Sequence, residues 1–226
     1  MYRYFIQPQL NKINKTLIGY ELLMKKRTTA GWRPPKHFSD IPAKIIADTL
    51  IATTEQLALK IGSVSVNLNR TQLMDPQITQ AIIRSQALLR PVKLIVELTE
   101  EPGDEHWPTT QLLAQIEKFT LRGMEISLDD VGTGENNLTQ IKALLPYTTE
   151  IKFALQDFSE SFQDEAFQQN VIFWRDLAAK HNLRFILEGI ENAADDAIAD
   201  RLAIDIRQGY YYGKPHLLKL KATDAE

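Results

Sequence analysis

Six residues with metal-binding or proton-carrying side chains fall at or near the ends of short apolar runs in this 226-residue chain. They are Asn67, Glu97, Asp129, Asp130, Lys152 and Glu188. Taken singly, a carboxylate at such a place is most often a helix cap or a turn residue. That explanation is weaker for Asn67 and Glu97, because both lie inside apolar runs, where an unpaired polar group is costly. If the runs are strands of one barrel, all six side chains meet at its carboxyl-end mouth, where barrel enzymes place their chemistry.

Several buried carboxylates gathered at one place repel one another and need a cation. The chain has no cysteine, so the site must use oxygen and nitrogen ligands. The four histidines share no spacing typical of a metal site and are predicted to lie in loops or on the surface: His37, His106, His181 and His216. Carboxylates with one asparagine oxygen suit magnesium, manganese or calcium. The adjacent Asp129 and Asp130 can divide between two ions, which is the arrangement used for displacement at phosphorus, so the residues suggest phosphodiester hydrolysis.

The elements that must position these side chains show an alternation of short apolar runs with longer segments of helical periodicity. This alternation is typical of βα units around a parallel sheet. Strands are predicted over 64–68, 93–98, 124–128, 149–153, 183–187 and, less clearly, 203–206. Two more strands, 4–7 and 17–23, are separated by the turn residues Asn11, Lys12 and Asn14 and are expected to pair antiparallel. About eight strands in this rhythm predict an α/β fold, a TIM-type (β/α)8-like barrel with an antiparallel first strand.

Helix boundaries carry recognisable signals between these strands. Asp40 ahead of Pro42, Asp75 ahead of Pro76, and Pro108 predict helix starts, while Gly62 and Gly123 stand where helices should stop.

Composition limits the possible classes of protein. With 44% hydrophobic and 24% charged residues and no linker-like stretch, the chain is expected to form one domain over 1–218, followed by a flexible tail over 219–226. A net charge of -3 argues against a general DNA or RNA binder, but allows a small anionic ligand held by a metal. The absence of cysteine and of an apolar leader or membrane span at the N-terminus predicts a cytoplasmic protein.

Several short motifs occur in the order in which they occur in one protein family. They are GYELL at 19–23, VNLN at 66–69, ELTE at 97–100, DDVGTG at 129–134, EGIEN at 188–192, and Asp205 followed by QGY at 208–210. This series resembles the EAL family of cyclic di-GMP phosphodiesterases over nearly the whole chain. One such motif is weak, whereas the series in order over this length is specific.

The resemblance implies hydrolysis of cyclic di-GMP to the linear dinucleotide with two Mg²⁺ or Mn²⁺ ions. It implies ligands for both ions: Glu21, Asn67, Glu97 and Asp129 for the first, and Asp129, Asp130 and Glu188 for the second. Lys152 would orient the attacking water, and with Glu21 and Glu188 it makes up the expected catalytic set.

The resemblance also assigns roles around this centre. Lys25 and Gln208 would contact the substrate, and Tyr210 would either stack on a guanine or serve packing. Glu100 and Glu191 would act one layer behind the metal ligands, with Glu100 fixing the loop that begins at Asp130. Dimerisation is a family expectation.

Three departures from the family pattern bear on activity. Ala154 stands where an aspartate is usual, Lys25 stands where an arginine is usual, and the loop 131–137 is altered. Lysine keeps the charge but loses the bidentate fork. Two alternatives therefore stay open: a degenerate EAL domain that acts as a cyclic di-GMP receptor or protein-binding regulator, and a barrel phosphodiesterase for another substrate.

Overall fold

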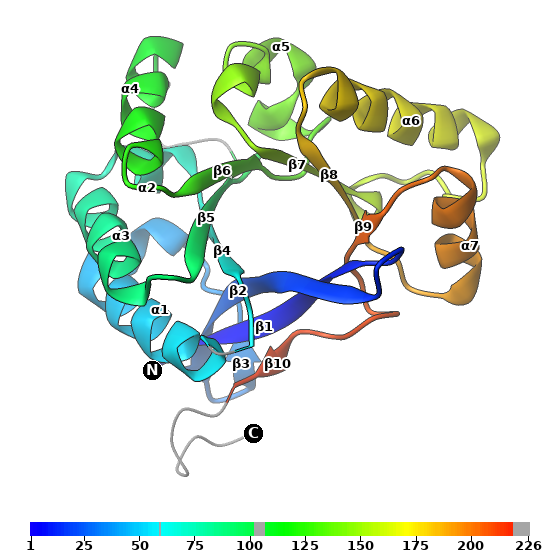
Figure 1. The fold of residues 1–226 in the computed structure, drawn as a ribbon. Coiled ribbons are helices and arrows are strands. Elements are labelled where there is room, and N and C mark those ends of the chain that lie inside the picture. The colour runs from blue at the N-terminus through cyan, green and yellow to red at the C-terminus, as the bar shows by residue number, and fades with distance from the viewer. Residues whose placement is uncertain (59, 102–106, 219–226) are drawn as a thin grey trace.

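Eight strands close into a barrel surrounded by helices in the computed structural model, which describes residues 1–58, 60–101 and 107–218 (Figure 1). The barrel strands are β1 (Tyr2–Asn11), β2 (Thr16–Thr28), β4 (Ser63–Leu68), β5 (Lys93–Leu98), β6 (Glu125–Leu128), β7 (Glu150–Ala154), β8 (Arg184–Glu188) and β9 (Ile206–Arg207). The short strands β3 (Gly31–Arg33) and β10 (His216–Leu217) extend its edges. The predicted tail 219–226 and His106 lie outside the described residues.

The helices form the outer ring of the barrel (Figure 1). They are α1 (Ala43–Leu57), α2 (Arg70–Met74), α3 (Pro76–Leu89), α4 (Thr109–Thr120), α5 (Leu138–Ile141), α6 (Glu165–Lys180) and α7 (Ala193–Arg201). No helix in the described part of the chain is both long enough and apolar enough to cross a membrane.

The first strand runs against its neighbours, as the sequence predicts. β1 pairs antiparallel with β2 on one side and with β9 on the other, whereas β2 and β4 to β9 are parallel. The register of this hairpin sets Gln7 opposite Glu21, so both side chains point to the same face of the sheet.

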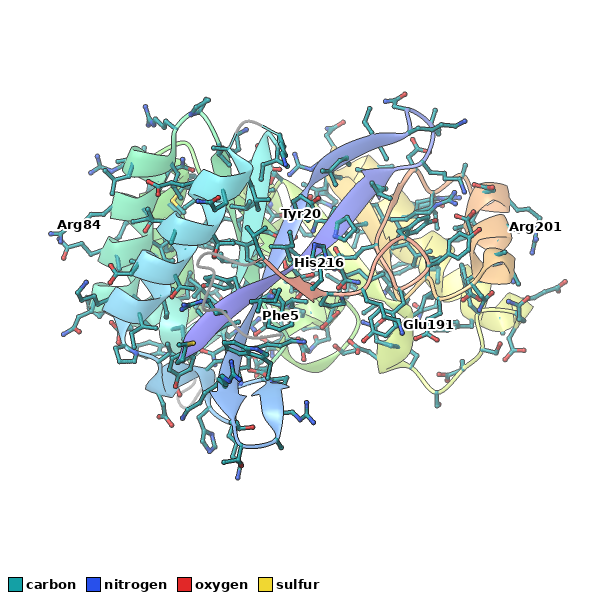
Figure 2. The ribbon with its side chains drawn as sticks, turned by 90° about the horizontal axis from the view of Figure 1, so that it is seen from below. Phe5, Tyr20, Arg84, Glu191, Arg201 and His216 are labelled. Atoms are coloured by element: carbon teal, nitrogen blue, oxygen red, sulfur yellow. The ribbon has the colours of Figure 1, made fainter. Side chains whose placement is uncertain are left out.

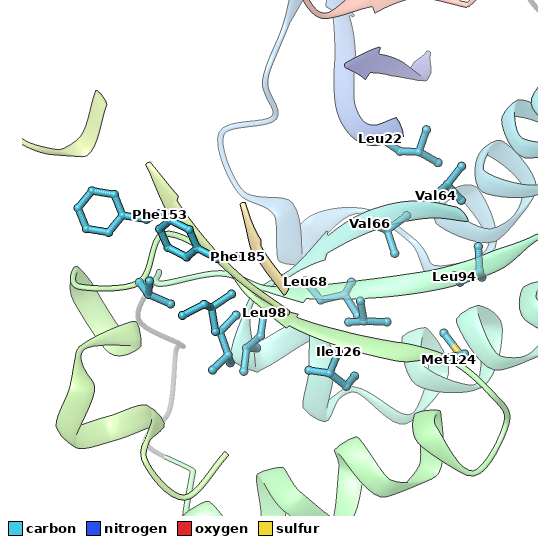
Figure 3. Close-up of a cluster of buried hydrophobic side chains, with 14 of the residues drawn as sticks. Leu22, Val64, Val66, Leu68, Leu94, Leu98, Met124, Ile126, Phe153 and Phe185 are labelled. Atoms are coloured by element: carbon cyan, nitrogen blue, oxygen red, sulfur yellow. The ribbon is translucent and has the colours of Figure 1, made fainter. Parts of the chain in front are cut away.

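Alternation along the strands divides apolar from polar side chains. Val64, Val66 and Leu68 of β4 are buried in the apolar layer shown in Figure 3. Successive side chains point to opposite faces of a strand, so Ser65 and Asn67 face the barrel interior. The same alternation turns the even-numbered residues of β5 outward and Glu97 inward. Burying each large apolar side chain contributes about 1.5–3 kcal/mol, which holds the register that aims the polar residues inward.

Two local predictions need correction. Only Ile206 of the run 203–206 belongs to the sheet, in the two-residue strand β9, because Ala203 adopts a left-handed backbone with φ 51° and belongs to the turn after α7. Asp40 does not cap α1: it ends a single 3-10 turn, Phe38–Asp40, and Pro42 precedes the helix without a side-chain cap. Asp75 does cap α3, since its Oδ1 accepts hydrogen bonds from the backbone N–H groups of Gln77 and Ile78.

Candidate active site

A buried lysine occupies the centre of the barrel mouth. The Lys152 Nζ lies 2.6 Å from Glu188 Oε1, 2.9 Å from Glu97 Oε2, 2.9 Å from Asp129 Oδ1 and 3.4 Å from Glu21 Oε2. The side chains of Lys152 and Glu97 have no exposed surface. Four chain segments far apart in sequence therefore bring a carboxylate to the ammonium group of a fifth segment.

Strand register explains this convergence. Asn67 pairs with Glu97 across β4 and β5, and Glu97 pairs with Ser127 across β5 and β6. Asp129 follows β6 directly, and Glu188 ends β8 opposite Ala154 of β7. Parallel strands in register end at the same rim, so inward-facing residues near their carboxyl ends share one layer.

Amide side chains fix the carboxylate of Glu21. Asn67 Nδ2 donates to Glu21 Oε1 at 2.7 Å, and Gln208 Nε2 donates to Glu21 Oε2. Gln208 Nε2 also donates to Gln7 Oε1 at 3.3 Å, and Gln9 Nε2 donates to Glu97 Oε1 at 3.5 Å. The contacts of Gln7 and Gln9 were not predicted. The signal in the sequence that could have revealed these contacts is a pair of glutamines two residues apart, which share one face of a strand.

Charge at the mouth is strongly unbalanced, because five carboxylates surround one ammonium: Glu21, Glu97, Asp129, Asp130 and Glu188. Burial, together with the neighbouring carboxylates and against the charge of Lys152, raises the pKa of Glu188 to about 8 and that of Asp130 to about 11. The pKa values of Glu97 and Asp129 are raised for the same reasons.

Two groups at the same mouth are held ionised. Burial raises the pKa of Glu21, but Lys152 and the hydrogen bonds from Asn67 and Gln208 bring it below its usual value. Burial lowers the pKa of Lys152, and the surrounding carboxylates more than reverse this.

The carboxylates form two groups that could each hold a metal ion. Glu21, Glu97 and Asp129 offer oxygen atoms within 4.8 Å of one another, and so do Asp129, Asp130 and Glu188. Asp129 is common to both groups. Asn67 Oδ1 and Asp130 Oδ1 are buried, and neither accepts a hydrogen bond from the described residues. Oxygen donors left open beside surplus negative charge fit a hard divalent cation.

The loop that carries Asp130 is tied down by an arginine and an asparagine. Asp130 adopts a left-handed backbone, φ 47°. Asn136 Nδ2 donates to the carbonyl oxygens of Leu98, at 2.7 Å, and Asp129. Arg70 donates to the Glu135 carbonyl at 2.8 Å and to Asn136 Oδ1 at 3.0 Å. These contacts span the altered segment 131–137, so this loop is braced by internal hydrogen bonds.

Glu100 meets this loop through its main chain. The Glu135 N–H donates to the Glu100 carbonyl at 2.8 Å. A β-carbon on Gly134 would lie 2.3 Å from that carbonyl oxygen, so the close approach requires glycine. Glu100 therefore contacts the loop through its main-chain carbonyl, and this contact does not involve its carboxylate.

The remaining predicted residues lie around a cavity of about 440 Å³ above the carboxylates. Lys25, Glu100, Gln208 and Tyr210 line it, together with Glu21 and Asn67. The Lys25 Nζ stands 4.2 Å from the centre of the Phe5 ring, a residue labelled in Figure 2.

Tyr210 and Glu191 stand further out from the carboxylates. Tyr210 is 53% exposed, and the Lys214 Nζ lies 5.2 Å from the centre of its ring. Glu191, also labelled in Figure 2, is exposed and lines a smaller neighbouring cavity with Glu188 and Gln208.

The departure at Ala154 is partly offset in space. Ala154 is fully buried and offers no carboxylate, but Asp157, at the end of the 3-10 turn Leu155–Asp157, contacts Asp130. Burial raises the pKa of Asp157, and a hydrogen bond with Asp130 opposes that rise. From the sequence alone, Asp157 is expected to lie too far from the barrel mouth to replace the usual aspartate. The turn brings it within hydrogen-bonding reach of Asp130.

The fold and the mouth together define an α/β barrel with a carboxylate-rich site fit for divalent cations. The EAL domain family model matches residues 2–215, and the chain belongs to this family. EAL domains are metal-dependent in general, in keeping with the clustered carboxylates.

Known relatives share this domain as part of longer proteins. The bifunctional diguanylate cyclase/cyclic di-GMP phosphodiesterase MucR of Pseudomonas aeruginosa is 24% identical over 236 residues, 92% of this chain and 32% of that protein. The cyclic di-GMP phosphodiesterase PdeR of Escherichia coli is 32% identical over 155 residues, 67% of this chain and 23% of that protein. The chain thus spans a third or less of the length of these two relatives.

Solved structures show the same fold. The PaMucR phosphodiesterase in complex with c-di-GMP superposes with a TM-score of 0.79 at 24% identity, covering 96% of this chain and 97% of that one. The FimX EAL domain from Pseudomonas aeruginosa bound to c-di-GMP gives 0.76 at 19% identity, covering 95% and 90%.

Proposed function

We propose that this chain is a phosphodiesterase that hydrolyses cyclic di-GMP to the linear dinucleotide with two Mg²⁺ or Mn²⁺ ions. The observation that carries this proposal is the pair of carboxylate groups that share Asp129 beneath an open cavity of about 440 Å³. Membership of the EAL family and similarity to relatives such as the cyclic di-GMP phosphodiesterase PdeR support cyclic di-GMP as the substrate.

Glu21, Asn67, Glu97 and Asp129 would hold one ion, and Asp129, Asp130 and Glu188 the other. When bound, such ions supply neutralisation of the phosphate, a lowered pKa for a water molecule and stabilisation of the leaving oxygen. The open oxygens of Asn67 and Asp130 and the surplus of negative charge support this assignment.

The other side chains would position and bind. Lys152 stays protonated, since the surrounding carboxylates raise its pKa, and its four contacts hold those carboxylates in place. Beside the ions, its ammonium would orient the attacking water. Lys25 offers a positive charge to a substrate phosphate from the cavity wall, and the exposed ring of Tyr210 offers a stacking surface for a guanine.

A turnover assay with a matched variant tests the proposal. Glu21→Gln keeps the shape of the side chain but removes its charge, and should lower kcat by about a hundredfold or more, as loss of a metal ligand or of its support does. Glu55→Gln, an exposed residue of α1, is the matched control and should leave kcat unchanged. Equal turnover by both variants would refute the assignment of Glu21.

A receptor without catalysis is the second candidate, favoured by the buried Ala154 in place of the usual aspartate. Calorimetry of cyclic di-GMP binding in calcium, together with turnover in manganese, separates the two functions. Binding without any product identifies a receptor, and product formation identifies an enzyme.

The proposal also includes assembly into a homodimer and action in the cytoplasm. Sedimentation velocity of the purified chain tests whether it forms a dimer.

A further inference from the structure

A second cavity lies between α3 and α4, outside the barrel mouth. Its volume is about 610 Å³, within the range of small-molecule sites. The two helices are neighbours in the outer ring (Figure 1), and Arg84 projects from α3 at the molecular surface (Figure 2). Arg90 and Arg122 each stand three residues before a barrel strand begins, so this part of the cavity lies at the end opposite the carboxylates.

Among the described residues that line this cavity there are four cations and no carboxylate. They are Arg84, Arg90, Lys118 and Arg122. None of the four forms an ion pair with a carboxylate of the described residues. The whole of α3 contains no aspartate or glutamate. Lys118 Nζ donates to Gln115 Oε1, which is neutral. In a chain of net charge -3, four cations without a carboxylate partner among the described residues are a local excess of positive charge that an anion would relieve.

The floor of this cavity is already ordered. Gln115 is buried, and its Nε2 donates to Thr79 Oγ1 at 2.9 Å and to the Leu73 carbonyl at 3.0 Å, which joins the two helices. Buried Gln86 donates to the Val92 carbonyl at 2.9 Å. A ligand would therefore meet a formed floor, and the side chains that it would have to order are the exposed cations.

The four cations come from both helices and from the residues that follow them. Arg84 lies within α3, and Arg90 is the residue directly after this helix. Lys118 lies within α4, and Arg122 stands two residues beyond it. Arg90 Nη2 donates to the Arg122 carbonyl at 3.3 Å, which joins the ends of the two helices. Cations near helix C-termini are also favoured by the helix dipole, but that effect does not explain why acidic partners are missing.

We propose that the α3–α4 cavity binds an organic phosphate that carries two or more negative charges. Arginine forks match phosphate oxygens bidentately, and the three arginines here can do so from both helices. This site is independent of the proposed hydrolysis at the barrel mouth.

Calorimetry of the full chain in EDTA tests the proposal. ATP, inorganic pyrophosphate and adenosine are the probes, and EDTA removes divalent cations that could hold phosphate at the barrel mouth. The double variant Arg84→Gln/Arg122→Gln should weaken ATP binding about tenfold or more, given the usual strength of charge-assisted hydrogen bonds. Lys180→Gln/Arg201→Gln removes the same charge from exposed positions elsewhere and should leave affinity unchanged.

The outcomes distinguish a site for phosphate groups in general from a site for nucleotides. Binding of both ATP and pyrophosphate supports a phosphate site, and tighter binding of ATP supports a nucleotide site. Three results would overturn the proposal: no ATP binding at millimolar concentration, adenosine binding as tightly as ATP, or equal weakening in the two double variants. Thermal unfolding of both variants shows whether the fold is kept, which is expected because all four altered side chains are exposed.

Discussion

Replacing Lys152 by methionine tests how much its buried ammonium group stabilises the folded protein against repulsion among the carboxylates at the barrel mouth. The substitution keeps an unbranched side chain of similar length and removes the one ammonium that contacts Glu21, Glu97, Asp129 and Glu188. In the absence of divalent ions, those carboxylates would then face one another uncompensated. We expect the variant to lose about 3–5 kcal/mol of unfolding free energy near neutral pH, the usual cost of leaving a buried charge without its partner.

The sign of the pH dependence follows from the carboxyl pKa values. In the folded protein, burial raises the pKa of Glu188 to about 8, above its value in the unfolded chain. The stabilisation from such a group is complete below the unfolded pKa and is lost as pH rises through the folded pKa. Lys152 also holds the pKa of Glu21 below its usual value against burial. Without this ammonium the folded pKa of Glu21 rises, so Glu21 can escape repulsion only by holding a proton that it has lost in the wild type. The loss in Lys152→Met should therefore be smaller near about pH 5 than near about pH 8.

Urea unfolding in EDTA, followed by circular dichroism across this pH range, measures the effect. Lys93→Met is the matched control, because Lys93 also pairs with a carboxylate, Glu125, but its side chain is 46% exposed. It should cost less than about 1 kcal/mol. Manganese should restore part of the stability of Lys152→Met. A loss equal to that of Lys93→Met, with no dependence on pH, would refute the reasoning.

Three further outcomes are expected. Lys25→Arg should lower the KM for cyclic di-GMP about two- to fivefold, because a guanidinium grips phosphate bidentately, and an unchanged KM in steady-state assays would contradict contact with the phosphate. The affinity for Mn²⁺, measured by calorimetry, should rise between about pH 6 and 8, and binding should release protons. The reason is that bound metal must displace protons from Glu188 and Asp130, whose pKa values are raised. An affinity for Mn²⁺ that does not change with pH would count against both residues as ligands. Asn136→Ala should weaken Mn²⁺ binding and expose the loop after Asp129 to proteolysis, since it removes two hydrogen bonds to main-chain carbonyls; equal proteolysis rates would contradict a bracing role.

Much of the barrel could be predicted because its strands carry a strong local pattern. The runs 93–98 and 64–68 match β5 and β4 closely. A strand that is buried on both faces needs a nearly continuous run of apolar residues, with few polar exceptions. Those exceptions, Asn67 and Glu97, are the residues that the barrel turns toward its mouth. The antiparallel opening pair could be predicted from the turn residues between its strands.

The parts that could not be predicted depend on contacts between distant segments. Arg70 reads as an ordinary charged residue at the start of a helix, yet it is buried and braces a loop more than sixty residues away. Asp157 is too far from Lys152 in sequence to suggest proximity, and only the 3-10 turn returns it toward Asp130. The short β9 could not be delimited, because two residues carry too little periodicity.

The most direct test of the central claim is to incubate the purified chain with cyclic di-GMP and identify the product by mass spectrometry, with and without Mn²⁺. We expect the linear dinucleotide, one water heavier than the substrate, to form only when the metal is present. Unchanged cyclic di-GMP after prolonged incubation with saturating Mn²⁺, in a sample shown to bind the nucleotide, would contradict the claim of hydrolysis.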